Sequence, residues 1–133
     1  MRNKKAGRKS GFTLLEMMIV MIIMGILLSI ALPIYNQALV KARESVLRND
    51  LFEMRKLISQ YTLDKQKAPQ SLEDLVSAGY IKAIPKDPIT NEANWEPHQE
   101  DILLSVDQQD PGIDDVHSAS NAISTQGDAY SGW

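Results

Sequence analysis

The chain has 133 residues, with 14 lysines and arginines, 17 aspartates and glutamates, and no cysteine. This length leaves room for one folding unit, and the lack of cysteine excludes disulfides and thiolate metal sites. Five of the basic residues lie within residues 1–11, so residues 12–133 carry 9 basic and 17 acidic groups, a net charge of −8. An acidic body of this kind argues against nucleic-acid binding, which needs a basic face.

A basic leader comes first and ends in two small residues, Ser10 and Gly11. A secretory signal places its small residues after the apolar segment, whereas here they precede it. The apolar segment runs from Phe12 to Leu32 and contains one carboxylate, Glu16. A charge at the membrane centre costs about 2.5–3.5 kcal/mol on insertion scales, so we expect Glu16 to have a function or a partner.

Residues 11–16 read glycine, phenylalanine, threonine, two leucines and glutamate. This stretch resembles the N-terminus of type IV pilins and type II secretion pseudopilins, which follows a class III leader. The resemblance implies that a prepilin peptidase cuts between Gly11 and Phe12 on the cytoplasmic side and methylates the new amine of Phe12. It also implies that Glu16 pairs with the N-terminal ammonium of a neighbouring subunit during filament assembly. Independently, Glu16 in the first turn complements the helix dipole; the alternative is a signal anchor that tolerates an interfacial glutamate.

The apolar segment is about 31 Å long as a helix, which matches one hydrocarbon core. Gly25 lowers helix propensity, and Pro33 removes an amide donor and crowds the carbonyl of Ser29. The resembling family carries a glycine and a proline at these offsets, which implies a loss of helical order between them in filaments; a simple kink is the alternative. Both interpretations predict a weak point near Pro33. The positive leader predicts that the N-terminus lies inside and the C-terminal part outside. The resemblance implies that the membrane is the inner membrane, with the N-terminus in the cytoplasm and the head in the periplasm.

After Pro33 the pattern becomes amphipathic, and residues 34–68 contain no glycine or proline. This predicts one continuous helix to about residue 65, whose apolar face covers a small sheet. The predicted apolar face comprises Leu39, Ala42, Val46, Leu51, Met54, Ile58 and Tyr61. The interleaved charges are interpreted as a solvated face, with pairing between neighbouring subunits as the alternative; they are Lys41, Arg43, Glu44, Arg48, Asp50, Glu53, Arg55 and Lys56.

A turn at residues 68–70 precedes a predicted short helix, Leu72 to Ala78, which ends at Gly79. Ser71 and Asp74 have the spacing of a capping box. The following run, residues 80–88, ends in proline, lysine, aspartate and proline, and closely resembles a segment of major type II secretion pseudopilins. That family commonly continues with tryptophan, glycine, asparagine and proline, whereas residues 89–92 here are Ile-Thr-Asn-Glu. We expect the turn to be kept through Asn91.

Short strands are predicted at residues 94–97, 102–106 and 113–118. Major pseudopilins bind calcium in their C-terminal loop, and the resemblance places Ser118, Asn121 and Asp128 nearest the ligand positions. Calcium takes six to eight oxygen ligands at about 2.3–2.6 Å, which such a loop can supply. The calcium prediction rests on resemblance, because the spacing is not that of an EF-hand. The alternative is a polar surface loop with no ion.

Catalytic chemistry finds little support in the sequence. Asp114 and Asp115 would face opposite sides of a strand, and no acid or nucleophile partner is apparent. His98 and His117 lack the spacing of paired zinc ligands. No glycine-rich phosphate loop or nucleophile elbow occurs. We therefore expect no enzyme, no catalytic residue and no catalytic cofactor.

The predicted fold is α+β, with a long N-terminal helix packed on a small antiparallel sheet. The predicted segments are a cleaved leader (1–11), a transmembrane and assembly helix (12–33), its amphipathic continuation (34–66) and a small periplasmic head (67–133). The resemblance implies a structural subunit of the periplasmic pseudopilus of type II secretion, which exports folded proteins. The implied partners are other copies of the chain, other pseudopilins, the prepilin peptidase and the inner-membrane assembly platform.

Two alternative functions have different requirements. A type IV pilus subunit for adhesion or motility would share the N-terminal motif, but that branch often carries a C-terminal disulfide, which this chain cannot form. A membrane-anchored periplasmic enzyme would need a catalytic constellation that the sequence does not offer.

Overall fold

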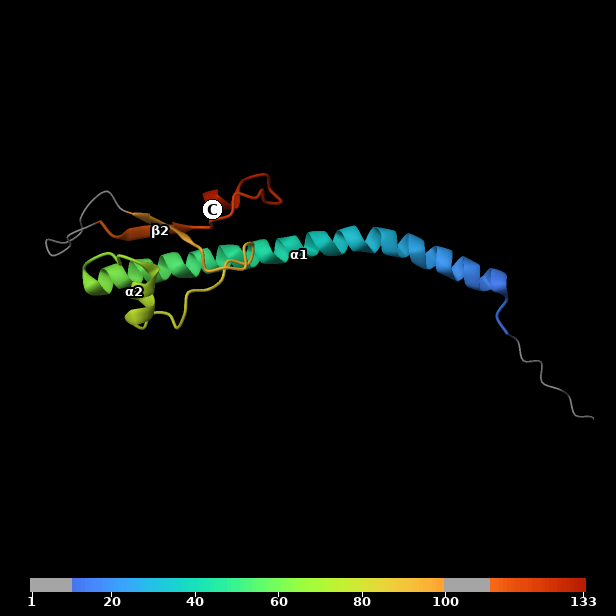
Figure 1. Ribbon diagram of the computed structural model, residues 1–133, viewed down its shortest axis with the longest axis horizontal. Coiled ribbons are helices and arrows are strands. Elements are labelled where there is room, and N and C mark those ends of the chain that lie inside the picture. The colour runs from blue at the N-terminus through green and yellow to red at the C-terminus, as the bar shows by residue number, and fades with distance from the viewer. Residues whose placement is uncertain (1–10, 100–110) are drawn as a thin grey trace, which may run out of the picture. The chain divides into compact units, whose positions relative to one another are not determined.

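The computed structural model describes residues 11–99 and 111–133. Its elements follow the order α1, α2, β1, β2 and a 3-10 turn, η1 (Tyr130–Gly132) (Figure 1). The chain forms two compact units, Met1–Ala38 and Leu39–Trp133. The strand predicted at residues 102–106 lies outside the described residues.

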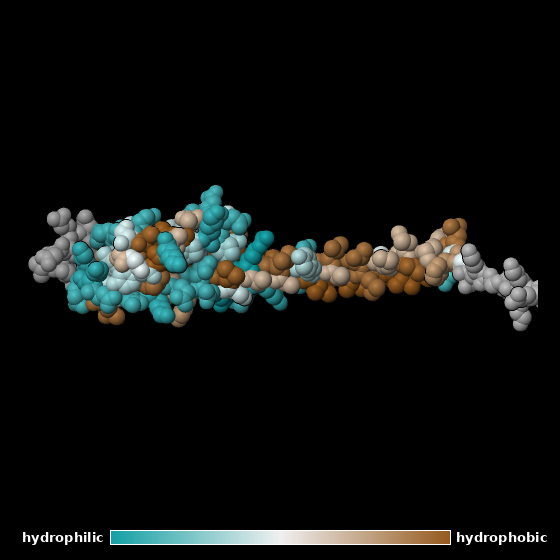
Figure 2. All heavy atoms as spheres, turned by 90° about the horizontal axis from the view of Figure 1, so that it is seen from below, coloured by the Kyte–Doolittle hydropathy of each residue, from teal (hydrophilic) through white to brown (hydrophobic). Residues whose placement is uncertain are grey.

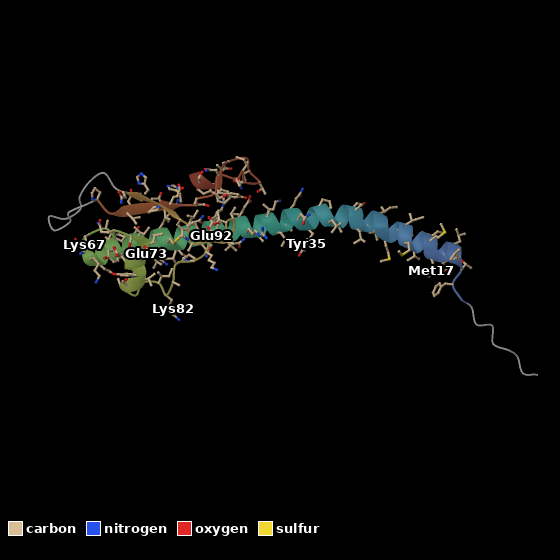
Figure 3. All side chains as sticks on the ribbon, viewed as in Figure 1. Met17, Tyr35, Lys67, Glu73, Lys82 and Glu92 are labelled. Atoms are coloured by element: carbon tan, nitrogen blue, oxygen red, sulfur yellow. The ribbon has the colours of Figure 1, made fainter. Side chains whose placement is uncertain are left out.

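The first unit contains the start of α1 (Leu14–Lys65), and its described side chains are all exposed. Figure 2 shows this part covered mainly in brown apolar spheres, and the side chains around Met17 and Tyr35 point outward in Figure 3. By length and composition, α1 is apolar enough to cross a membrane. An uncovered apolar surface of this extent calls for lipid or neighbouring helices.

The helix α1 continues through Gly25 and Pro33 without interruption. Within this stretch the Ser29 hydroxyl donates a hydrogen bond to the Ile26 carbonyl at 2.7 Å. The predicted continuous helix to about residue 65 is therefore confirmed. The predicted loss of helical order between Gly25 and Pro33 concerns the assembled filament, and it stays a prediction.

In the second unit, α1 buries a face that repeats every three or four residues. The register of this face differs from the predicted one at its start, because Leu47 is fully buried whereas Leu39, Ala42 and Val46 are exposed. One residue rotates a helix by about 100°, so placing Leu47 inward turns Val46 away from the core. The prediction for Leu39, Ala42 and Val46 is wrong, and the buried positions are Glu44, Leu47, Leu51, Met54, Ile58 and Tyr61.

The short helix α2 (Leu72–Ser77) lies where it was predicted. The Asp74 carboxylate accepts hydrogen bonds from the backbone N–H groups of Gln70 and Ser71, at 2.8 and 3.2 Å. The chain leaves the helix through Gly79 in the left-handed region, with φ of 81°. These contacts confirm the capping by Asp74 and the glycine stop. They bring Leu72 and Leu75 into the core.

Two antiparallel strands form the sheet, β1 (Glu96–Gln99) and β2 (Ile113–His117). The strands predicted at residues 94–97 and 113–118 are confirmed with slightly shifted bounds. Gln99 pairs with Ile113 and His98 pairs with Asp115, so Asp114 has no opposite residue and forms a bulge. Strict alternation would send Ile113 and Val116 to opposite faces, and the bulge lets both be buried.

The core of the head is one cluster that joins α1, α2 and β2 with two aromatic residues from the loops, Trp95 and Tyr130. The indole N–H of Trp95 donates to the Pro85 carbonyl at 2.8 Å, so its polar atom is satisfied. In Figure 1, β2 runs beside the second half of α1. The α+β fold, with the long helix packed on a small antiparallel sheet, is confirmed.

The register of α1 can be tested with two adjacent substitutions. Leu47→Ala should lower the free energy of unfolding by about 2–5 kcal/mol, because it opens a cavity in the core. Val46→Ala, its control, should change it by no more than about 0.5 kcal/mol, because Val46 is 50% exposed. The measurement is denaturant unfolding of the full chain in detergent, followed by tryptophan fluorescence. Equal losses for the two variants would contradict the observed register.

A second test concerns Gly112, which is buried against the turn that precedes α2. A Cβ at this position would lie 2.8 Å from the Pro69 carbonyl oxygen and closer still to Ala68, and the N–H of Ile113 already donates to that oxygen at 2.7 Å. Gly112→Ala should therefore cost about 1–3 kcal/mol in the same unfolding experiment. Gly132→Ala is the control, since a Cβ there meets nothing within 4 Å. Unchanged stability of Gly112→Ala would show that the approach is looser than described.

Candidate functional site

The N-terminal motif lies immediately before and within the first turn of α1. Residues 11–13 are not helical, Phe12 is 77% exposed, and a Cβ on Gly11 would meet nothing within 4 Å. The Gly11–Phe12 peptide bond therefore lies in open, non-helical chain, a conformation that a peptidase can bind.

Thr13 and Glu16 form a reciprocal pair at the start of α1. The N–H of Glu16 donates to the Thr13 hydroxyl at 3.2 Å, and the N–H of Thr13 donates to the Glu16 carboxylate at 3.4 Å. This arrangement is a capping box, which satisfies two backbone donors that a helix start leaves free. Glu16 lies in the first turn, as predicted. The role of Thr13 was not predicted, although the Thr-x-x-Glu spacing signals it.

At the other end of the chain, the loop after β2 (residues 118–133, the C-terminal loop) is attached to α1 by a buried carboxylate. Glu44 is only 6% exposed. It accepts hydrogen bonds from the Thr125 N–H at 2.7 Å, the Thr125 hydroxyl at 2.6 Å and the Tyr130 hydroxyl at 2.9 Å. Burial raises the pKa of Glu44, but these hydrogen bonds and the charge of Arg48 outweigh burial, so the net shift is downward.

Two arginines further along α1 hold the same loop. Arg48 donates to the Gln126 side chain at 3.0 Å, and its guanidinium lies 4.1 Å from the centre of the Trp133 ring. Arg55 pairs with Asp115 and donates to the main-chain carbonyls of Val116 and Trp133, at 3.0 and 2.9 Å. The interpretation of these charges as a solvated face is therefore wrong for Glu44 and incomplete for the two arginines.

The sequence did not reveal the partners of these three charges, because they lie far along the chain. Thr125 and Tyr130 are 81 and 86 residues from Glu44. One local signal existed for Glu44: it stands three residues before Leu47, in the register that the buried face of α1 follows. A charge at a core position of a helix is a sign of a buried partner.

The turn after residue 86 depends on Asp87, which is fully buried. One oxygen of its carboxylate accepts the N–H of Ile89 at 2.7 Å, and the other accepts the Ser118 hydroxyl. Asn91 adopts a left-handed conformation with φ of 60° and donates its N–H to the Asp87 carbonyl at 2.7 Å. The expectation that Asn91 keeps the turn is confirmed. The role of Asp87 was missed, although aspartate is a residue that typically closes such turns.

The three residues proposed for calcium have separate roles in the structure. Ser118 is fully buried and donates to Asp87, and Asn121 is exposed. The two oxygens of Asp128 accept the Ser124 hydroxyl at 2.9 Å and the Trp133 indole N–H at 2.8 Å, and these bonds lower the Asp128 pKa. Within residues 11–99 and 111–133, no three acidic or histidine side chains gather as a metal site would require. The residues as arranged here do not fit a calcium cage, and the calcium prediction has no support from them.

The histidines and adjacent aspartates have structural partners. His98 contacts Asp114 at 2.7 Å across the bulge between the strands. His117 lies 3.4 Å from the Asp115 carboxylate and also contacts the Trp133 carbonyl. Asp114 and Asp115 thus turn to different partners, as expected of neighbours in a strand.

Comparison with known proteins adds two findings. Residues 7–32 match the family model of the prokaryotic N-terminal methylation motif. Over 107 residues the chain is 36% identical to the type II secretion system core protein G of Vibrio cholerae, covering 69% of this chain and 73% of that protein. The proteins of the same name from Aeromonas hydrophila and Klebsiella pneumoniae are each 35% identical, covering 63% and 61% of this chain and 70% and 69% of those proteins. No solved structure matches.

The matched motif contains Gly11, Phe12 and Glu16, the residues that surround the open peptide bond and the capped start of α1. The similarity to the secretion proteins extends over many more residues than this motif and reaches into the head. Because of this similarity to the secretion proteins, the chain belongs to the family of type II secretion system core protein G.

Proposed function

We propose that the chain is a structural subunit of the periplasmic pseudopilus of a type II secretion system, whose growth drives folded proteins across the outer membrane. The observation that carries this proposal is the joining of a methylation motif to a head that resembles the core protein G of Vibrio cholerae. These relatives do not favour the alternative of a type IV pilus subunit. The role is mechanical, and a cytoplasmic ATPase elsewhere in the machine would supply the energy.

The first unit supports an anchor in the inner membrane. Its exposed apolar helix is long enough to span the hydrocarbon core, and the basic residues before it favour a cytoplasmic N-terminus. The head would then lie in the periplasm. In this orientation the open Gly11–Phe12 bond is at the cytoplasmic surface, where a prepilin peptidase would cut it and methylate Phe12.

Assembly would use Glu16 as the partner of the Phe12 ammonium on a neighbouring copy. Among residues 11–99 and 111–133, the Glu16 carboxylate accepts one long hydrogen bond, from the Thr13 N–H at 3.4 Å, so lone pairs are left for a cation. In an apolar surrounding, an ammonium and a carboxylate attract strongly and lower each other's cost of burial. The exposed apolar side chains of the same helix would pack against other copies and other pseudopilins, after delivery by the inner-membrane assembly platform.

The processing step predicts the first residue of the mature protein. Intact-mass measurement of membrane-extracted protein should show a chain that begins with N-methylated Phe12. Gly11→Val should leave the leader attached, because a branched side chain would crowd a bond that glycine leaves open. A mature protein that retains residues 1–11, or that is cut after Leu32, would contradict this assignment.

The assembly step predicts that charge at residue 16 matters more than helix capping. Glu16→Ala should still insert into the membrane but should reduce filament yield at least about tenfold, because a charge-assisted pair is lost. Glu16→Gln should behave like Ala although it keeps the capping-box geometry. Glu53→Gln is the control, since Glu53 is an exposed glutamate further along the same helix. Filament yield is measured by shearing and quantitative immunoblotting, and normal yield from Glu16→Gln would rule out the pairing.

A further inference from the structure

The C-terminal loop presents hydrogen-bond donors to Glu44 of α1. The loop oxygens that face α1, those of the Gln126 side chain and the Trp133 carbonyl, accept hydrogen bonds from Arg48 and Arg55. A loop that binds a cation turns carbonyl and carboxylate oxygens inward. Here Thr125 directs its N–H and its hydroxyl at the Glu44 carboxylate, and Tyr130 directs its hydroxyl at the same group. The negative charge at the centre of this arrangement belongs to the helix, and the loop surrounds it with donors. A cation placed among these donors would be repelled by their positive ends.

Both oxygens of the Glu44 carboxylate accept hydrogen bonds from the loop. Its Oε1 atom accepts two of the three hydrogen bonds and its Oε2 atom accepts the third, all within 2.9 Å. Arg48, one turn further along α1, adds a favourable charge. Buried carboxylates are tolerated when donors and a nearby cation replace their hydration, and both are present here.

The Asp128 carboxylate is also occupied. The segment from Ser124 to Asp128 is a tight turn, in which the N–H of Ser124 donates to the Asp128 carbonyl at 2.7 Å and Gly127 has a φ of 96°. The Asp128 side chain closes this turn through the Ser124 hydroxyl and also accepts the Trp133 indole N–H. A calcium ion at Asp128 would have to share both carboxylate oxygens with these donors.

We propose that a carboxylate from α1 replaces a structural cation in this chain: Glu44 holds the C-terminal loop through Thr125 and Tyr130, so the folded head does not require calcium. We call these three hydrogen bonds the Glu44 lock. Tyr130 extends the lock into the core, because it is buried and its ring meets the Trp133 ring edge to face at 5.1 Å between centres. The proposal concerns the head alone, and it stands or falls independently of the role in secretion.

The test uses the full chain in detergent, with thermal unfolding followed by tryptophan fluorescence. Both tryptophans, Trp95 and Trp133, report on the head. The wild-type melting temperature should agree within about 1 °C between excess EDTA and millimolar calcium, since a ligand that does not bind the native state cannot shift it. Glu44→Gln should lower the melting temperature by about 5 °C or more in both conditions, because its amide N–H group would oppose the donors of the loop. Glu53→Gln, the exposed glutamate on the same helix, should leave it unchanged.

Milder variants keep the test decisive if Glu44→Gln fails to fold. Tyr130→Phe and Thr125→Val each remove one hydroxyl donor and should each lower the melting temperature by a few degrees, again without dependence on calcium. Tyr130→Phe should have a smaller effect in the Glu44→Gln background than alone, because coupled partners are not additive. A saturable rise of several degrees with calcium that Asp128→Ala abolishes would overturn the proposal. A Glu44→Gln variant with the melting temperature of the wild type would also overturn the proposal.

Discussion

The packing of the head depends on one face of α1, between Glu44 and Tyr61, to which the other elements attach. The positions of this face recur every three or four residues, and all of them are covered by the rest of the head. The apolar members meet α2, β2 and the two aromatic residues from the loops, whereas Glu44 meets the C-terminal loop. Because a helix is rigid along its axis, the spacing of these side chains also sets where the sheet and the loop attach.

Hydrogen bonds and ion pairs attach the C-terminal loop and β2 to α1, and such polar contacts matter for a head of this size. A domain with one short helix and two short strands buries limited apolar surface, so contacts that close the loops matter for its stability. Arg55 illustrates this: one guanidinium joins the Asp115 carboxylate to two main-chain carbonyls, those of Val116 and Trp133. The Trp133 carbonyl also contacts His117, so the chain end is held by two side chains. Arginine is suited to this position because its fork of donors is planar and stays charged.

The two parts of α1 have different surroundings. Up to Ala38 its side chains are mostly apolar and exposed, which fits lipid or other helices, and beyond Leu47 it is amphipathic and half covered. Within residues 14–38, Glu16 is the one charged side chain, and Glu44 is the charged side chain on the buried face of the second part. In both places the carboxylate accepts hydrogen bonding from donors of the protein itself, although Glu16 is exposed and Glu44 is buried.

The sequence by itself determined the features that depend on neighbours along the chain. The apolar span, the Gly11–Phe12 motif, the continuous helix to Lys65, and the stop of α2 at Gly79 all follow from composition, periodicity and short-range caps. Only the tertiary structure decided which face of α1 is buried where the helix enters the head, between about residues 39 and 47. It also decided where the bulge at Asp114 lies and which charges hold the C-terminal loop. The reason is physical. The periodic pattern of α1, with the charge of Glu44 at one position, fits two helix registers equally well. A distant donor, the Tyr130 hydroxyl 86 residues away, decides between them because it makes burial of the Glu44 charge favourable.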